Sequence, residues 1–248
     1  MPAGAGAWVQ SKGKAQVIVK GEAMRADDAF DPDGKRVTLA VERRDTTVGV
    51  FAEYGLSGRM TLQVKGDWQD GQDAFVDYQG RGPIEIGLVW QAWRNDRGAV
   101  SLYAGYASAG DGRNAGYAAP GVGQDDWEVR ASAGWTFDMK KPTQRWRALL
   151  YPQRSFVEVQ VARRMRDGLP DETRADFTFG RHLGNSWMML NQIYSGETDG
   201  GGARWVQTES SVVRQVGSWS IQAGWRQPLG GREVPATRGP VLAIWRRF

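Results

Sequence analysis

The single histidine of the chain stands close to a serine. His182 and Ser186 are separated by three residues in the segment Gly180–Ser186. An imidazole that hydrogen-bonds a serine hydroxyl can act as the base that activates it as a nucleophile. Here, however, the two residues flank a predicted tight turn, and no nearby carboxylate would orient the imidazole. We therefore interpret both as turn residues and predict no catalytic residue.

Metal and cofactor chemistry is also poorly supported. With no cysteine and one histidine, only hard oxygen ligands such as carboxylates remain. Two acidic segments offer them, one with Asp27, Asp28, Asp31 and Asp33, and the other at Asp125–Asp126. We interpret both as solvated loop segments and predict no metal and no cofactor. The run Gly200–Gly202 is a loop tip and no phosphate cradle, because no helix follows it.

Charge is distributed evenly along the chain. Its 32 basic and 28 acidic residues give a formal net charge of +4, and the two signs are interleaved. No basic run or patch resembles the arm of a nucleic-acid-binding protein. The sequence therefore predicts no nucleic-acid partner.

Along much of the chain, apolar and polar side chains alternate with a period of two residues. In the segment 127–137, Trp127, Val129 and Trp135 alternate with polar or small residues. Successive side chains of a β-strand point to opposite faces, so such a segment is a strand with one apolar face. The segments 60–68, 84–92 and 219–226 repeat the pattern, and tryptophans again stand at their ends.

Segments of this kind predict about twelve strands of a length that spans a bilayer when tilted. Their expected ranges are 14–26, 37–54, 59–69, 82–94, 99–109, 126–138, 154–166, 172–182, 186–197, 203–215, 218–229 and 239–248. Short turns and longer polar loops alternate between them. The expected longer loops are Asp27–Arg36, Gly71–Gly80, Gly110–Asp125, Asp167–Asp171, Thr198–Gly202 and Gly230–Arg238. One connection, Met139–Gln153, is long where a short turn is expected.

Alternating strands with alternating loop lengths are typical of a transmembrane barrel. We predict an all-β, antiparallel, up-and-down barrel of about twelve strands in a Gram-negative outer membrane. Residues 1–248 form one domain, with 1–13 as an N-terminal periplasmic segment, both termini and the short turns periplasmic, and the longer loops extracellular. The start, Met1–Ala7, looks like a mature end from which a signal peptide was removed. The alternative fold is a soluble, lectin-like β-sandwich with the tryptophans in its core.

The C-terminal strand resembles the assembly signal of outer-membrane barrel proteins. In that pattern, apolar residues stand at every second position back from a terminal phenylalanine, here Leu242, Ile244 and Phe248. Arg246 departs from it. The segments Gly13–Val19 and Ala52–Leu62 are similar to segments of uncharacterised outer-membrane barrel proteins. In those proteins, a turn similar to Tyr54–Leu62 joins two strands. The resemblance implies recognition by the barrel-assembly machinery and carries no known activity.

The inner face of the barrel is the best candidate for function. Alternation predicts that eleven polar side chains line the lumen: Lys65, Asp67, Glu85, Gln91, Glu128, Arg130, Glu158, Gln160, Asp176, Gln222 and Arg226. Charges of both signs suit either an aqueous path or a set of ion pairs that fills the lumen and braces the wall.

Three functions follow from these alternatives. The first is a porin-like passive channel for small polar solutes. The second is a non-conducting structural or partner-anchoring barrel, for which the segments 117–122 and 146–151 are candidate docking sites. The least favoured is a lipid-modifying enzyme with His182 as its base. The expected partners are outer-membrane lipid and lipopolysaccharide, the assembly machinery, and an envelope protein in the second case.

Overall fold

The computed structural model describes residues 6–74, 77–110, 123–138 and 152–248. The two candidate docking segments, 117–122 and 146–151, therefore lie outside the described residues. No helix in the described part of the chain is long and apolar enough to cross a membrane.

Thirteen strands and one short 3₁₀ helix make up the described chain. In order they are β1 (Ala15–Phe30), β2 (Arg36–Gly55), β3 (Met60–Gln72), β4 (Asp77–Arg94), β5 (Gly98–Ser108), β6 (Asp125–Phe137), β7 (Pro152–Met165), β8 (Glu172–Leu183), β9 (Trp187–Thr198), η1 (Asp199–Gly201), β10 (Arg204–Val216), β11 (Trp219–Arg232), β12 (Val234–Pro235) and β13 (Gly239–Arg247). Each predicted strand is present, with its ends displaced by a few residues.

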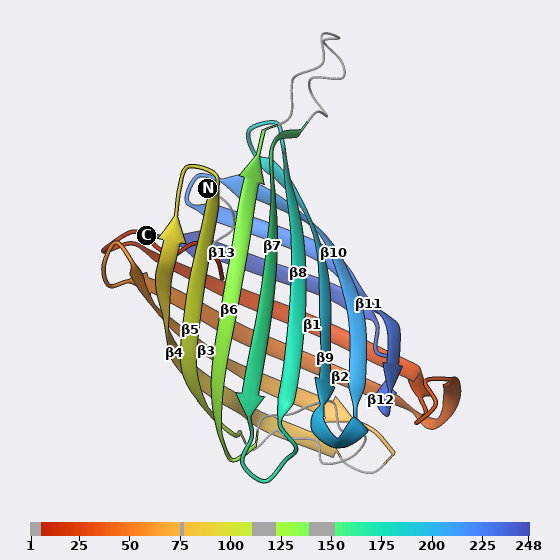
Figure 1. The fold of residues 1–248 in the computed structure, drawn as a ribbon. Helices are drawn as coiled ribbons and strands as arrows, with labels where there is room; N and C mark the ends of the chain where they lie inside the picture. Colours follow the sequence, from red (N-terminus) through yellow and green to blue (C-terminus); the bar gives the residue numbers. More distant parts are fainter. Residues whose placement is uncertain (1–5, 75–76, 111–122, 139–151) are drawn as a thin grey trace.

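These strands form one closed antiparallel barrel (Figure 1). From β2 to β11, each strand pairs with the next strand in sequence. β11 then pairs with β13, because the short β12 is not part of this series. The barrel closes because β1 pairs with β2 on one side and with β13 on the other. Twelve strands build the wall, while β12 only adds two residues beside the end of β1. The predicted barrel is confirmed, and the sandwich is wrong because there is a single closed sheet.

The wall has an apolar outside and a polar inside. On β6, Trp127, Val129 and Trp135 face outward and remain 59%, 50% and 44% exposed, whereas Glu128 on the inner face is 2% exposed. The other strands also have Val, Ile, Leu and Trp side chains on the outside and polar side chains on the inside. This arrangement is the reverse of that in a soluble protein, whose apolar side chains are buried. Such a surface suits contact with lipid, and closure leaves no unpaired strand edge in it.

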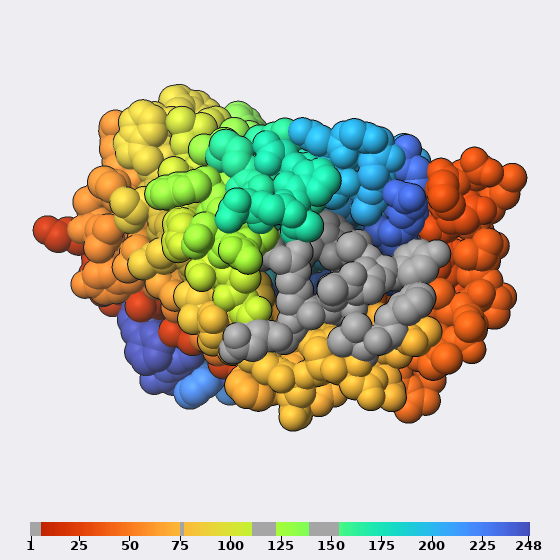
Figure 2. Space-filling view, turned by 90° about the horizontal axis from the view of Figure 1, so that it is seen from below, coloured from red at the N-terminus to blue at the C-terminus, as the bar shows by residue number. Residues whose placement is uncertain are grey.

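The two ends of the barrel differ. At the turn end, the hairpins β2–β3, β4–β5, β8–β9 and β10–β11 close through short turns, two of which use glycines with positive φ, Gly184 and Gly217. Both chain termini lie at this end because the number of wall strands is even (Figure 1). Figure 2 views the opposite, loop end, where the red-orange hairpin of β1 and β2 forms one side of the rim.

Three expected loops are shorter than predicted, and one of them, Gly230–Arg238, contains the end of β11 at Arg232 and the two-residue strand β12. β1 continues through Asp27 and Asp28 to Phe30, and β3 and β4 extend to Gln72 and Asp77. Polar side chains in these stretches indicated loops, but the backbones still pair in antiparallel register. Strands that rise above the apolar band lose the apolar alternation without losing their hydrogen bonds.

Candidate functional site in the barrel lumen

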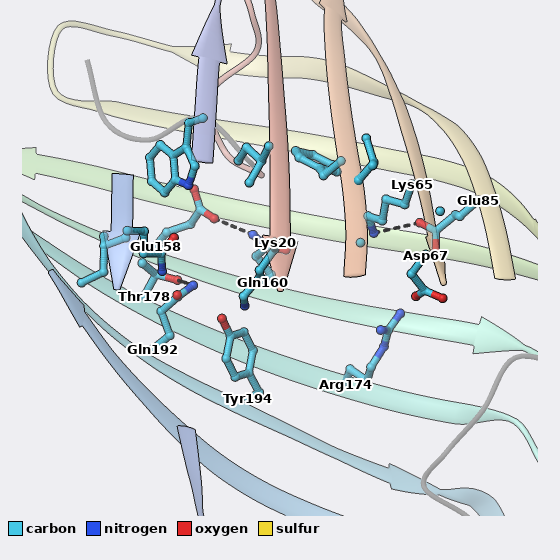
Figure 3. Close-up of a pocket in the computed structure, with 18 of the residues that line it drawn as sticks. Lys20, Lys65, Asp67, Glu85, Glu158, Gln160, Arg174, Thr178, Gln192 and Tyr194 are labelled. Carbon is cyan, nitrogen blue, oxygen red and sulfur yellow. Dashed lines mark hydrogen bonds and ion pairs between the residues drawn. The ribbon is translucent and has the colours of Figure 1, made fainter. Parts of the chain in front are cut away.

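The barrel encloses a chamber of about 560 Å³. Inward side chains from both sides of the wall line it (Figure 3). Lys65 and Asp67 of β3 and Glu85 of β4 stand on one side, and Arg174 of β8 and Tyr194 of β9 on the other. Cationic, anionic and aromatic groups therefore meet around one internal space.

A first group of ion pairs, the Glu85 cluster, crosses the lumen beside this chamber. Arg164 of β7 places Nη2 at 2.6 Å from Oε2 of Glu85 and at 2.6 Å from Oε2 of Glu128. Lys65 Nζ approaches Glu85 Oε1 at 3.0 Å, and Arg130 Nη2 approaches Glu128 Oε1 at 2.6 Å. These pairs connect β3, β4, β6 and β7 through their side chains. Charges that share partners in this way are stabilised despite their burial.

Tyr103 of β5 completes the Glu85 cluster. Its hydroxyl donates a hydrogen bond to Glu85 Oε1 at 2.6 Å, and the Arg130 guanidinium lies 4.5 Å from its ring centroid. The ring lies over two glycines of the inner wall, Gly87 and Gly105, where an added Cβ would overlap it. The glycines therefore allow a large aromatic ring to lie flat along the wall instead of filling the lumen.

A second group, the Glu209 cluster, lies on the other side of the barrel. Glu209 of β10 is fully buried and accepts Lys20 Nζ at 3.1 Å and Arg226 Nη2 at 2.7 Å. Arg226 also approaches Glu22 Oε1 at 2.8 Å. Gln222 donates to Glu209 Oε1 at 3.2 Å. Two cations and two carboxylates thus share one network between β1, β10 and β11.

The N-terminal segment enters the turn-end mouth of the barrel. The amide of Ala7 donates to Glu158 Oε2 at 3.1 Å, and its carbonyl accepts from Gln91 Nε2 at 2.6 Å. Further along, Gln10 Nε2 donates to Glu53 Oε2 at 2.8 Å. Residues 6–10 of the expected periplasmic segment 1–13 are thus held against lumen-facing side chains and narrow the mouth.

Trp8 anchors this segment in an apolar floor. Its ring meets Phe156 edge-on, with centroids 6.1 Å apart. It also occupies the space above Gly134, where an added Cβ would overlap the indole. The floor consists of inward side chains from the turn-end halves of the strands, namely Phe156, Met188, Leu190, Val213, Ala243 and Trp245, with Trp8 and Ile18 packed against it. The chamber therefore has an apolar wall at its turn end, and charged and uncharged polar side chains line much of the rest.

All eleven predicted lumen residues lie on the inner face of the wall. Six of them line the chamber: Lys65, Asp67, Glu85, Glu158, Gln160 and Gln222. Glu128, Arg130 and Arg226 belong to the ion-pair clusters. Gln91 holds the N-terminal segment, and Asp176 lines a small cavity beside Arg130. Contact of any of them with a passing solute remains a prediction.

Sequence reasoning missed several members of the site. Arg164 and Arg174 complete the Glu85 cluster, and Lys20, Glu22 and Glu209 form most of the other one. The signal was available, because each stands at an inward position of a strand that was itself predicted. Their pairing was not accessible, since it depends on which strands face each other across the lumen.

The remaining candidate residues have ordinary structural surroundings. His182 faces the ring of Phe156 at 6.5 Å, and no hydrogen bond joins it to Ser186 among the described residues. Asp31 Oδ1 accepts the amides of Asp33 and Lys35 in the β1–β2 turn. No group of three or more potential metal ligands occurs in the described ranges.

The candidate assembly signal lies on the lipid-facing side of β13 and the residue after it. Leu242, Ile244 and Phe248 point outward and are 61%, 51% and 60% exposed. In the structure, as in the predicted pattern, these three side chains lie on the same, outer face of the last strand. Their recognition during assembly remains a prediction.

Comparisons with known proteins concern the fold. No family model matches the chain, and no curated protein matches it in sequence. Among solved structures, an outer membrane channel from Pseudomonas putida F1 is similar, with a TM-score of 0.69, 12% identity and 100% of both chains covered. The NanC porin has a TM-score of 0.57 at 6% identity, covering 92% of this chain and 98% of that one. The KdgM porin, solved in complex with disordered oligogalacturonate, has a TM-score of 0.55 at 6% identity, covering 94% and 99%. The chain therefore has the fold of outer-membrane channels and porins.

Proposed function

We propose that this protein is an outer-membrane channel for small polar solutes, with its termini and short turns in the periplasm. The observation that carries the proposal is the internal chamber of about 560 Å³, lined by Lys65, Asp67, Glu85 and Arg174 among others. Its volume is in the range of small-molecule sites. The similar fold of known channels and porins supports the same function without identifying a solute.

Charged side chains of both signs are suited to the passage of hydrated solutes. Hydroxyls, carboxylates and ammonium groups of a solute find hydrogen-bond partners on opposite walls, while the chamber size limits what enters. The N-terminal segment and the Glu85 cluster make the path narrow. We therefore assign small solutes and a low conductance rather than the bulk flow of a wide porin.

A swelling assay tests this function. Proteoliposomes containing the protein are diluted into isotonic solutions of glycerol, arabinose, glucose or sucrose, and the rate of swelling is followed by light scattering. The proposal expects swelling that falls steeply with solute size. Rates equal to those of protein-free liposomes for all four solutes contradict it. Heat-modifiable migration on a gel verifies that the barrel is folded in each preparation.

A second function is favoured by one specific observation. The Glu85 and Glu209 clusters link strands on the inner face of the wall, and residues 6–10 occupy the turn-end mouth. Such a braced interior suits a non-conducting barrel that anchors another envelope component. Recovery of a stoichiometric complex after gentle extraction, together with no swelling for any solute, favours this function over the channel.

A further inference from the structure

The turn-end rim of the wall from β8 to β13 carries three arginines that stack on aromatic rings. The distances from arginine Cζ to ring centroid are 5.8 Å for Arg181 over Phe179, 5.0 Å for Arg214 over Trp187, and 4.5 Å for Arg246 over Trp219. Strand register fixes two of these contacts, since Arg214 and Trp187 are direct partners, as are Arg246 and Trp219. We call Arg181, Arg214 and Arg246 the arginine belt.

The belt lies on the outer, lipid-facing side of the barrel. Trp187, Trp219 and Phe248 point outward there and are 42%, 48% and 60% exposed. Exposed tryptophans at the end of an apolar wall mark the boundary between hydrocarbon and headgroups. The stacked guanidinium groups therefore stand at the depth of lipid phosphates.

No carboxylate neutralises the belt. Among the described residues, none of its three arginines has an ion-pair partner. Arg246 Nη1 donates to the hydroxyl of Ser218 at 2.8 Å, and Nε of Arg181 is buried with no hydrogen-bond partner. The buried Nε of Arg181 cannot reach an external acceptor, but the terminal N–H groups of the three guanidinium groups, apart from the one bonded to Ser218, make no hydrogen bond within the described chain and are the donors that an external acceptor would use.

Arginines at the loop end are arranged differently. Arg163 Nη2 pairs with Asp199 at 2.5 Å, Arg232 Nη2 with Glu197 at 2.7 Å, and Arg238 Nη2 with Asp27 at 3.2 Å. Hydrogen bonds from Arg163 hold the pKa of Asp199 below its ordinary value. The chain therefore supplies its own anions at one rim and leaves the guanidinium groups unneutralised at the other.

The surroundings of the belt reinforce its positive charge. The turns and strand ends at this rim also carry Arg59, Arg94, Arg97, Arg154 and Arg247. Outside the lumen, the described carboxylates at this end are those of Asp96, Asp138 and the C-terminal residue Phe248, and none of them forms an ion pair with a belt arginine. Basic residues therefore outnumber acidic ones on the outside of this rim, which favours the approach of an anion.

We propose that the arginine belt binds the phosphodiester headgroups of anionic phospholipid. Guanidinium groups form paired, charge-assisted hydrogen bonds to phosphate oxygens, which suits the unneutralised donors of Arg181, Arg214 and Arg246. The source is a bilayer lipid because the same face presents exposed Trp187 and Trp219 to acyl chains. Stacking on the rings holds the guanidinium groups in place before the lipid arrives. This site does not depend on conduction through the lumen.

Native mass spectrometry of the detergent-solubilised, folded barrel tests the proposal. The protein is titrated with phosphatidylglycerol and, separately, with phosphatidylcholine of the same acyl chains. The test variant is Arg181→Gln/Arg214→Gln/Arg246→Gln, and the matched control is Arg163→Gln/Arg232→Gln/Arg238→Gln at the loop end. A third variant replaces the three belt arginines by lysine, which keeps the charge and removes the planar fork.

The belt predicts tighter binding of phosphatidylglycerol than of phosphatidylcholine to the wild type. Affinity for phosphatidylglycerol falls roughly tenfold in the glutamine variant, falls less in the lysine variant, and is unchanged in the loop-end control. Equal binding of both lipids, or an equal loss in the control, overturns the proposal. Soluble glycerophosphoglycerol provides a last arm, since binding of this headgroup as tight as that of the lipid identifies a plain anion site and also overturns it.

Discussion

Arg164 and Glu85 meet inside the lumen at 2.6 Å, although they stand on β7 and β4, three strands apart in the wall. The same guanidinium nitrogen approaches Glu128 at 2.6 Å. One side chain therefore joins strands that are not neighbours. This contact makes the Glu85 cluster both a brace for the wall and the boundary of any path through it.

Replacing Arg164 should weaken the barrel and change its selectivity. Arg164→Met leaves the buried Glu85 and Glu128 with fewer cations, and breaking a buried pair costs about 3–5 kcal/mol. Urea titration in lipid vesicles measures the free energy of unfolding, and the reversal potential across a KCl gradient should shift toward cation selectivity. The control is Arg44→Met, whose exposed pair with Glu42 should contribute less than about 1 kcal/mol. Equal losses for the two variants contradict the bracing role.

Arg226 tests the Glu209 cluster in the same way. Arg226→Gln removes a cation that is shared by Glu22 and the fully buried Glu209, so the lumen becomes more negative on the β10–β11 side. We expect the ratio of K⁺ to Cl⁻ permeability to rise, by a reversal-potential measurement. Arg232→Gln at the loop rim serves as the control, because its partner Glu197 is outside the lumen clusters. An unchanged ratio in Arg226→Gln would place this cluster away from the ion path.

Trp8 should control the width of the turn-end mouth. Trp8→Ala removes the ring from its place against Phe156 and above Gly134, which loosens residues 6–10. Single-channel conductance should then rise severalfold, with more frequent fluctuations. Lys12→Ala, in the exposed part of the same segment, should leave the conductance unchanged. If both variants conduct as the wild type does, the segment does not limit the path.

The two faces of the wall should respond differently to a new charge. Val159→Arg places a cation on the lipid-facing side of β7, where it costs about 2–4 kcal/mol near the bilayer midplane. Gln192→Arg faces the chamber, where water and polar groups solvate it. Urea titration should therefore show a much larger loss for the Val159 variant. The reverse order of stability would mean that the assignment of inner and outer faces is wrong.

His182 should be dispensable. Its ring packs beside Phe156, and within the described part of the chain no hydrogen bond joins it to Ser186. His182→Ala should leave swelling rates and the phospholipid composition of membranes that contain the protein unchanged, by light scattering and by lipid mass spectrometry. Accumulation of lysophospholipid with the wild type, lost in His182→Ala, would instead identify a lipid-modifying enzyme.

Much of the fold follows from a single repeat in the sequence. Alternation in segments such as 127–137 locates the strands because every second residue meets lipid, and an even strand number places both termini at one end. Closure then follows because an open sheet edge cannot be exposed to lipid. Errors fall at strand ends. β1 continues through Asp27 and Asp28, beyond the apolar band. The backbone still pairs with β2 there, but the side chains no longer contact lipid and need not be apolar.

The site was less accessible from the sequence. Inward positions such as Lys65 and Glu128 follow directly from alternation. The contact of Arg164 with Glu85 depends on barrel curvature and strand stagger, which no local pattern encodes. The segment containing Ala7 and Trp8 has no periodicity, so its place in the mouth was missed. Gly134 stands at an inward position of β6 and has no side chain. It was therefore a hint in the sequence that the lumen has space there for an inserted ring.

Single-channel recording of the folded protein in a planar bilayer tests the central claim most directly. The account predicts small, steady openings whose current scales with salt concentration, and whose ion selectivity shifts toward cations in Arg130→Gln, because Arg130 is paired with Glu128 beside the chamber. A heat-modifiable barrel that inserts into the bilayer and passes no current above that of empty lipid would contradict the channel. The braced, partner-anchoring barrel would then be the better account of this lumen.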